Sequence, residues 1–172
     1  SVDEQDYQNI EYIIIDAKSN DRTLSIIEKY KKNIKILISE KDEGIYDAFN
    51  KGLNLANGDL IGFVNSDDTL TQDGLKILVK YYNNYPNADF FFGSVKKSWG
   101  IRHGYKPWMI YFTWGFYTSH STGFYIKKEA AKKVGNYNVK YKCSADYDYF
   151  YRMIVHKKVK GIGTKKKELF GI

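Results

Sequence analysis

Short apolar runs alternate with helical patterns through the first half of the chain, and this alternation constrains the fold more than any other feature. Buried strands are expected at residues 11–16, 34–39, 59–64 and 88–95. Between them, apolar residues recur at the spacing of amphipathic helices. Because strands that alternate with helices form parallel sheets covered on both faces, we predict an α/β fold: a three-layer α/β/α sandwich with a mostly parallel central sheet.

The second half of the chain has a weaker pattern. Residues 98–119 are irregular and aromatic, 122–135 predict a strand followed by a helix, and 143–158 predict a final helix with two carboxylates near its start. No internal repeat, linker or low-complexity segment interrupts the 172 residues. We therefore expect a single domain over residues 1–172.

The composition narrows the classes of function. The single cysteine, Cys143, excludes an internal disulfide and a cysteine-rich zinc site. No window approaches the roughly 18 unbroken apolar residues of a membrane span, and residues 1–9 do not resemble a signal peptide, so a cytoplasmic protein is expected. The net charge of +7 owes much to the lysine-rich stretch 155–168. It favours an anionic partner (nucleotide phosphates, nucleic acid or an anionic membrane face), or else it marks a solvated surface.

Three carboxylates, those of Asp16, Asp67 and Asp68, stand where predicted strands end. In open α/β sheets, ligands bind beyond the carboxyl ends of the strands. The adjacent carboxylates of Asp67 and Asp68 repel each other unless a cation lies close, and a divalent cation such as Mg²⁺ or Mn²⁺ meets that need. The alternative is a strand-to-helix turn in which one of the two caps a helix that begins near Thr71.

The stretch that leads to this acidic pair resembles the bacterial family 2 glycosyltransferases. Residues 39–68 read SEKDEGIYDAFNKGLNLANGDLIGFVNSDD. They are similar to the family pattern D-x-G-I-Y-D-A-M-N-K-G followed by A-x-G-x-x-I-x-F-L-N-S-D-D, with Phe49 in place of the methionine. Three further family elements are matched, in the family's order, by NIEYIIIDAKSNDRT, SHSTGFYIKKE and SADYDYFYR. The resemblance implies the GT-A (Rossmann-like) fold and a metal-dependent hexosyltransferase in bacterial polysaccharide biosynthesis.

The resemblance also implies a donor site for a nucleotide sugar, a UDP-hexose or UDP-N-acetylhexosamine. Asp16 would hydrogen-bond the uracil, although a strand-end turn is the simpler role for this residue. Ser19 belongs to the same element and is placed in the same site, and it is also available as a helix cap. Asp67 and Asp68 would form the DXD-like element that binds Mg²⁺ or Mn²⁺ and the ribose or diphosphate.

Further residues are placed by the same resemblance. Asp146 would be the general base of an inverting transfer, unless it is only a carboxylate favoured by the start of its helix. Asp148 is expected to be structural. Asp47 and Lys51, on the helix before the acidic pair, are placed in the donor site, with Lys51 near a phosphate or a sugar hydroxyl. His120 could contact the sugar, the diphosphate or the acceptor, and a structural role fits it equally well.

The resemblance divides the expected domain into a nucleotide-sugar part, residues 1–97, and an acceptor-side part, residues 98–172. The family's first strand has no counterpart here, so the chain is expected to begin inside the fold and to leave an unpaired sheet edge that favours a homodimer. A surface glycan or lipid-linked glycan would be the acceptor. The late lysines would then hold the protein peripherally at the inner face of the plasma membrane.

Two other functions remain open. A sugar-phosphate nucleotidyltransferase shares the α/β sheet and the acidic metal ligands, but its glycine-rich phosphate loop is not visible here. A non-enzymatic module that binds nucleic acid or glycans would use the basic and aromatic residues. That module would not need Asp67, Asp68 and Asp146 at element boundaries, and we therefore expect no nucleic-acid partner.

Overall fold

Strands and helices alternate from β1 to β4, as the sequence pattern predicts. The structure, a computed structural model, describes residues 1–112 and 121–172. Its strands are β1 (Ile13–Asp16), β2 (Ile36–Ser39), β3 (Leu60–Gly62), β4 (Phe90–Phe92), β5 (Ser94–Lys97), β6 (Gly100–Arg102), β7 (Phe124–Lys127), β8 (Gly161–Gly163) and β9 (Leu169–Gly171). Its α-helices are α1 (Thr23–Lys29), α2 (Ile45–Leu55), α3 (Gly74–Asn84), α4 (Lys128–Val134) and α5 (Ala145–Tyr151). Short 3₁₀ or π segments lie at Lys31–Asn33, Pro107–Tyr111, Ser121–Gly123 and Arg152–His156.

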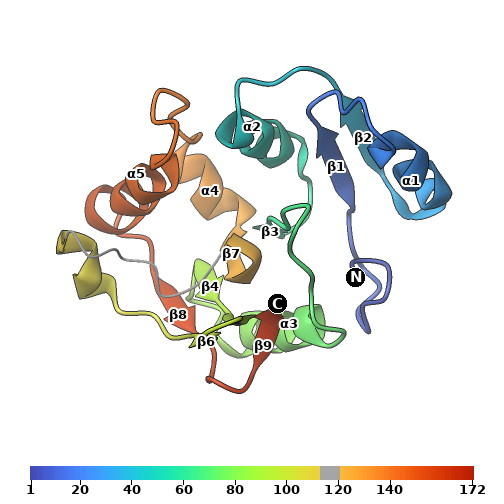
Figure 1. The fold of residues 1–172 in the computed structure, drawn as a ribbon. Helices are drawn as coiled ribbons and strands as arrows, with labels where there is room; N and C mark the ends of the chain where they lie inside the picture. Colours follow the sequence, from blue (N-terminus) through green and yellow to red (C-terminus); the bar gives the residue numbers. More distant parts are fainter. Residues whose placement is uncertain (113–120) are drawn as a thin grey trace.

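Within the described ranges, the strands form three small sheets (Figure 1). β1 and β2 are parallel, with Asp16 opposite Ser39 at their carboxyl ends. The central sheet has the order β3–β7–β4–β8, in which β7 runs antiparallel to both neighbours. The third sheet has the order β6–β5–β9. The α/β class is confirmed, but the sheets are mixed rather than mostly parallel. β7 comes from a distant part of the chain and inserts between β3 and β4, and a local pattern does not reveal such an insertion.

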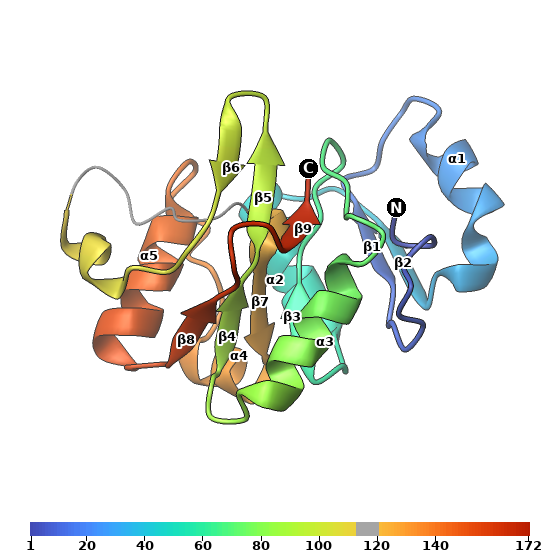
Figure 2. The same cartoon turned by 90° about the horizontal axis from the view of Figure 1, so that it is seen from below.

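Two hydrophobic cores lie on opposite faces of the central sheet. Strand geometry points alternate side chains to opposite faces, so Phe90 and Phe92 of β4 enter the core beneath α2, α4 and α5, while Phe91 enters the core beneath α3. All three phenylalanines are buried because both faces are covered. Figure 2 shows α3 on the near face of this sheet, with α2 and α4 behind it.

Helix α2 joins the β1–β2 pair to the central sheet. Figure 2 shows the pair beside β3, at the opposite end of the molecule from β8 and α5. Gly52 of α2 lies against the side chains of Ile15, in β1, and Phe63, which follows β3. Among the described residues, β1 pairs only with β2 and β3 pairs only with β7. Both strands therefore carry an edge that no described strand covers.

The local structure of α2 follows from its sequence. The helix begins after Gly44, whose φ of +122° is a backbone conformation that side chains rarely adopt. Leu53, on the inner face of the helix, is buried in the core. Phe49, one turn before it, stacks on Phe63 with ring centroids 4.4 Å apart. The residue that replaces the family's methionine is therefore part of the packing that fixes α2 above β3.

Several sequence-based boundaries were wrong. The strand expected at 88–95 is two strands interrupted at Gly93, where the ring of Phe170 approaches too closely for any side chain at that position. The last expected helix ends its α-helical part at Tyr151, and β8 and β9 follow it. Both late strands have only three residues and contain glycine, so they carry too weak a local signal to be predicted.

Candidate functional site

The carboxylate of Asp16 lies at the carboxyl end of β1 and closes the loop that follows the strand. Its Oδ1 accepts a hydrogen bond from the hydroxyl of Ser19 at 2.5 Å, and its Oδ2 accepts one from the backbone N–H of Ser19 at 3.1 Å. The hydroxyl of Ser39, at the end of β2, donates to Oδ2 at 2.6 Å. Ser19 therefore supports Asp16 and does not cap α1, whose N-cap position is Arg22.

These hydrogen bonds decide the charge state of Asp16. Burial by itself raises the pKa of this carboxyl, but the hydrogen bonds from Ser19 and Ser39, together with the N–H of Lys18, outweigh burial and hold the pKa below its ordinary value. A carboxylate has about four lone-pair sites, and these donors occupy most of them. Asp16 is thus an ionised turn residue, and any further donor would have to share its oxygens.

The carboxylate of Asp68 is buried and is held by several polar side chains. Its Oδ2 accepts hydrogen bonds from the side-chain amide of Asn65 at 3.0 Å and from the hydroxyl of Thr122 at 2.9 Å. Its Oδ1 lies 3.2 Å from the ammonium group of Lys97. These partners come from the segment after β3, the turn before β7 and the end of β5, so three parts of the chain hold this one side chain.

The acidic pair divides into a buried and an exposed member. Asp68 is buried, whereas Asp67 is exposed. Neither caps α3, which begins at Gly74 with Asp73 in the N-cap position. The capping role is therefore wrong, although the chain does turn here, with the N–H of Asp68 donating to the carbonyl of Asn65. The structure therefore holds the side chain of Asp68 in place, and the carboxylate of Asp67, next to it in sequence, is exposed.

The oxygen ligands of this pair suit a hard divalent cation. Mg²⁺ is commonly held by one or two carboxylates together with substrate phosphates, and Asp67 and Asp68 supply that number. No group of three or more His, Cys, Asp or Glu side chains with metal-binding geometry occurs within residues 1–112 and 121–172. The described residues therefore offer Asp67 and Asp68 as protein ligands here and no third side chain of these types.

The two predicted residues on α2 form an ion-pair cluster with the end of β2. Lys51 lies 2.9 Å from the carboxylate of Glu40 and 3.3 Å from that of Asp47, one helical turn earlier. Asp47 also accepts a hydrogen bond from the backbone N–H of Glu43 at 3.2 Å. The ammonium group of Lys51 is therefore neutralised by two carboxylates, and it would have to leave them to reach a phosphate.

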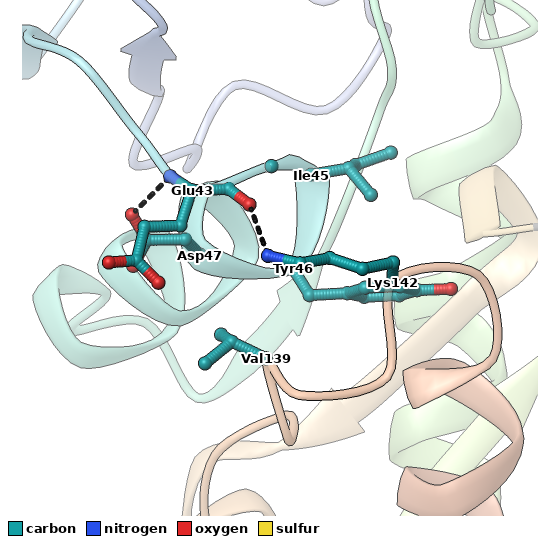
Figure 3. A pocket seen from close by; sticks show the side chains of 7 residues that line it. Glu43, Ile45, Tyr46, Asp47, Val139 and Lys142 are labelled. Carbon is teal, nitrogen blue, oxygen red and sulfur yellow. Dashed lines mark hydrogen bonds between the residues drawn. The ribbon is translucent and has the colours of Figure 1, made fainter.

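A small pocket with a cavity volume of about 20 Å³ lies beside this cluster (Figure 3). It is lined by the start of α2 and by the loop that carries Val139 and Lys142, whose ammonium group donates to the carbonyl of Glu43 at 3.3 Å. Sites for drug-sized ligands usually measure roughly 300–1,000 Å³. The pocket does not include Asp16 or Asp68, so it is not the expected donor site.

Asp146 lies in the first turn of α5, as predicted, and contacts a tyrosine from α2. The pKa of Tyr46 is raised to about 12, mainly by burial and to a smaller extent by the negative charge of Asp146. The Tyr46 hydroxyl donates to the Asp146 carboxylate, which adds to the rise, while the backbone N–H of Asp146 donates to the hydroxyl and opposes it. Tyr46 is thus a neutral phenol at physiological pH that can orient the carboxylate of Asp146.

A stack of aromatic rings supports this contact. Tyr46 stacks on Tyr137, with centroids 5.8 Å apart, and Tyr137 stacks on Tyr149 of α5, at 4.1 Å. Asp148 takes no part in the stack: its carboxylate forms an ion pair with Arg152 at 2.9 Å. This ion pair agrees with the structural role expected for Asp148, which stays a prediction. His120 lies outside the described residues.

Interpretation of the sequence missed the residues that form hydrogen bonds or ion pairs with the predicted site residues. Ser39 had a usable signal, because it ends the strand predicted to pair with that of Asp16. Tyr46 also stood in the quoted motif. Asn65 and Thr122 are polar residues at turns, whose partners depend on which strands are neighbours. Lys97 had no signal, because the strand that carries it was not separated from β4.

An α/β fold with acidic side chains at the ends of β1 and β3 is the arrangement of a GT-A protein. The model of the family named Glycosyl transferase family 2 matches residues 1–150. This chain therefore belongs to glycosyltransferase family 2.

The match with curated relatives covers only part of each relative's length. A PGL/p-HBAD biosynthesis glycosyltransferase of Mycobacterium bovis is 28% identical over an alignment of 157 positions, and the match covers 88% of this chain and 61% of the relative. An uncharacterized glycosyltransferase of Haemophilus influenzae is 35% identical over an alignment of 104 positions, and the match covers 54% of this chain and 42% of that protein. The chain thus spans less than two thirds of the length of either relative.

Solved structures share the fold at low sequence identity. Staphylococcus aureus TarS has a TM-score of 0.79 and 18% identity, and the match covers 99% of this chain and 32% of TarS. The mannosyltransferase PcManGT of Pyrobaculum calidifontis, solved with GDP-Man and Mn²⁺, has a TM-score of 0.69 and 19% identity, covering 98% of this chain and 50% of that one. These likenesses confirm the GT-A fold.

Proposed function

We propose that this chain transfers a sugar from a nucleotide sugar to a glycan acceptor, with inversion at the anomeric carbon. The observation that carries the proposal is the fixed carboxylate of Asp68, which side chains from three parts of the chain hold at the end of β3. Family membership supplies the class of reaction, and this carboxylate would hold the divalent cation that offsets the negative charge of a diphosphate.

The donor is proposed to be a UDP-sugar, a hexose or N-acetylhexosamine. A structure of TarS with this fold contains UDP-GlcNAc, and PcManGT was solved with a divalent cation. Asp16 and Ser19 lie at the end of β1, where the base would be bound, and a uracil N–H would replace one of the donors that now satisfy Asp16. A Mg²⁺ or Mn²⁺ ion on Asp67 and Asp68 would supply the positive charge that stabilises the leaving diphosphate.

Asp146 is proposed as the general base of the transfer. Its carboxylate takes the proton of an acceptor hydroxyl while that oxygen bonds to the anomeric carbon, and the bond from the anomeric carbon to the diphosphate oxygen breaks. UDP leaves from the opposite face of the sugar, so no covalent sugar–enzyme intermediate forms. Tyr46 orients the carboxylate through the hydrogen bond that its hydroxyl donates.

The acceptor is proposed to be a growing or lipid-linked glycan. A relative from Methanococcus voltae, 40% identical over 85 residues, is named for transfer to a dolichyl-phosphate-linked sugar, and the match covers 45% of this chain and 26% of that protein. None of the described helices is long and apolar enough to cross a bilayer. A peripheral contact would therefore use the surface, where the lysines of the stretch 157–167 are all exposed. The open edges of β1 and β3 are where a homodimer could form.

Calorimetric titration of UDP, with and without Mn²⁺, tests the donor site. We expect the wild type to bind UDP in the presence of Mn²⁺. Asp68→Asn should weaken this binding by roughly tenfold or more, as losses around metal sites commonly do. The matched control is Asp73→Asn, an exposed aspartate that begins α3 and makes no capping hydrogen bond, and it should bind as the wild type does.

The outcomes separate the proposals. UDP binding that ignores both Mn²⁺ and Asp68→Asn would remove the metal from the proposal. Absence of UDP binding, together with release of pyrophosphate from a nucleoside triphosphate and a sugar phosphate, would favour a nucleotidyltransferase instead. Release of UDP from a UDP-sugar, lost in Asp146→Asn, would support the transfer itself.

A further inference from the structure

The buried carboxylate of Asp68 already faces a cation that belongs to the chain. The ammonium group of Lys97 lies 3.2 Å from Oδ1, and the side chains of Lys97 and Asp68 are only 25% and 5% exposed. An ion pair that is largely shielded from water interacts more strongly than one on the open surface. Any second cation that approaches this oxygen therefore meets a resident positive charge.

Strand geometry explains why Lys97 points inward. Successive side chains of a strand point to opposite faces. Lys97 therefore shares a face with Val95, which is fully buried, while Lys96 between them is exposed on the other face. The carboxyl end of β5 and the segment after β3 lie at the same end of the molecule (Figure 2), so β5 delivers this lysine to the acidic pair.

Among the described residues, the two oxygens of Asp68 have different partners. Oδ2 accepts hydrogen bonds from the neutral groups of Asn65 and Thr122, which fix the orientation of the carboxylate. Oδ1 faces the charged group of Lys97. A divalent cation and an ammonium group repel each other strongly when only a few ångströms apart, so both cannot share Oδ1. Lys97 can move, because its ammonium group ends a flexible four-carbon chain.

We propose that Lys97 is an exchangeable cation of the donor site. It neutralises Asp68 while the site is empty, it gives up Oδ1 when Mg²⁺ or Mn²⁺ binds, and its freed ammonium group then pairs with the donor's diphosphate. This inference rests on the proposed nucleotide-sugar donor site. It makes the metal and the diphosphate bind together, because displacement of Lys97 by the metal is compensated only when the phosphates are present.

Binding of Mn²⁺ alone, followed through the electron paramagnetic resonance signal of the free ion, tests the exchange without any catalytic readout. We expect Lys97→Met to bind Mn²⁺ roughly tenfold more tightly than the wild type, an effect between those of exposed and buried ion pairs. Lys96→Met, the neighbouring lysine on the exposed face, is the matched control and should leave the affinity unchanged. At saturating Mn²⁺, UDP should bind Lys97→Met roughly tenfold more weakly, and Lys97→Arg should retain UDP binding.

Other results would overturn the exchange. Equal or weaker Mn²⁺ binding by Lys97→Met would show that Lys97 does not compete with the metal. If Lys97→Met unfolds, Lys97→Gln gives the same comparison with a polar side chain of similar length. Failure of the exchange is distinguishable from failure of the proposed function. In the first case the wild type binds UDP with Mn²⁺ and the lysine variants do not differ in Mn²⁺ affinity, and in the second case the wild type does not bind UDP at all.

Discussion

The side-chain amide of Asn50 makes two hydrogen bonds to the backbone of a single residue, Tyr137. Its Nδ2 donates to the Tyr137 carbonyl at 2.9 Å, and its Oδ1 accepts from the Tyr137 N–H at 2.7 Å. Asn50 is buried on α2, and Tyr137 lies in the loop between α4 and α5. This contact fixes the helix that carries Lys51 and Tyr46 against the part of the chain that leads to Asp146.

Replacement of Asn50 is expected to be strongly destabilising. Asn50→Ala would leave a buried backbone donor and a buried acceptor without partners, at a cost of about 2–4 kcal/mol in the free energy of unfolding. Asn54→Ala, one turn later on the exposed side of α2, should change that free energy by less than about 0.5 kcal/mol. Urea unfolding followed by circular dichroism measures both. A small effect at Asn50 would mean that water replaces the amide.

Removal of the charge at Asp146 should abolish transfer without loss of donor binding. Asp146→Asn is expected to lower kcat by roughly 10²- to 10⁴-fold, the usual contribution of a general base, with the affinity for UDP unchanged. Asp148→Asn is the control on the same helix: it breaks the ion pair with Arg152 and should lower stability and not kcat. If Asp148→Asn and Asp146→Asn lower kcat equally, Asp146 is not distinguished as the base.

The lowered pKa of Asp16 predicts a pH-dependent contribution to stability. Because burial is outweighed by the hydrogen bonds from Ser19 and Ser39, the folded state favours the ionised carboxylate. This stabilisation is fully present above the ordinary carboxyl pKa of 3.8 and is lost as the pH falls through the lower folded pKa. The stability advantage of the wild type over Asp16→Asn should therefore shrink on acidification. Urea midpoints of the wild type and Asp16→Asn over a pH series measure this change, and a constant difference between them would contradict it.

Tyr149 carries a buried hydroxyl that no described group satisfies. Its removal in Tyr149→Phe should leave the stability unchanged or raise it by up to about 1 kcal/mol, because the ring packing is retained and no hydrogen bond is lost. Tyr147→Phe provides the contrast, since the Tyr147 hydroxyl donates to the carbonyl of Ile110 at 2.6 Å. That variant should lose about 1 kcal/mol. A drop in melting temperature for Tyr149→Phe would reveal a partner for its hydroxyl.

The sequence was sufficient for the elements with strong local patterns. β1, α2 and α3 lie where apolar spacing placed them, because each buries one face against a neighbouring layer. β8 and β9 could not be predicted, since three-residue strands that contain glycine are stabilised by their sheet neighbours. The antiparallel direction of β7 also depends on its neighbours and not on its own residues.

For the site, the sequence identified charges but not their partners. The resemblance to the family located Asp68 and Asp146, and the structure places each against polar side chains from distant segments. Thr122 reaches Asp68 only because β7 inserts next to β3. Contacts of this kind require the order and direction of the strands, which a local reading of residues does not provide.

The small β1–β2 sheet gives the two ends of the site unequal rigidity. α1 has no buried residue, and Ile26, Tyr30 and Leu37 in this region remain 41–51% exposed. Regions with few buried apolar contacts open at lower free energy than the core. The backbone amides of β1 should therefore exchange with deuterium before those of β4. A nucleobase bound at Asp16 would then be held by a part of the protein that opens more easily than the core. Part of the donor's binding free energy would go into ordering this part, and slow exchange in β1 would report that the donor is bound.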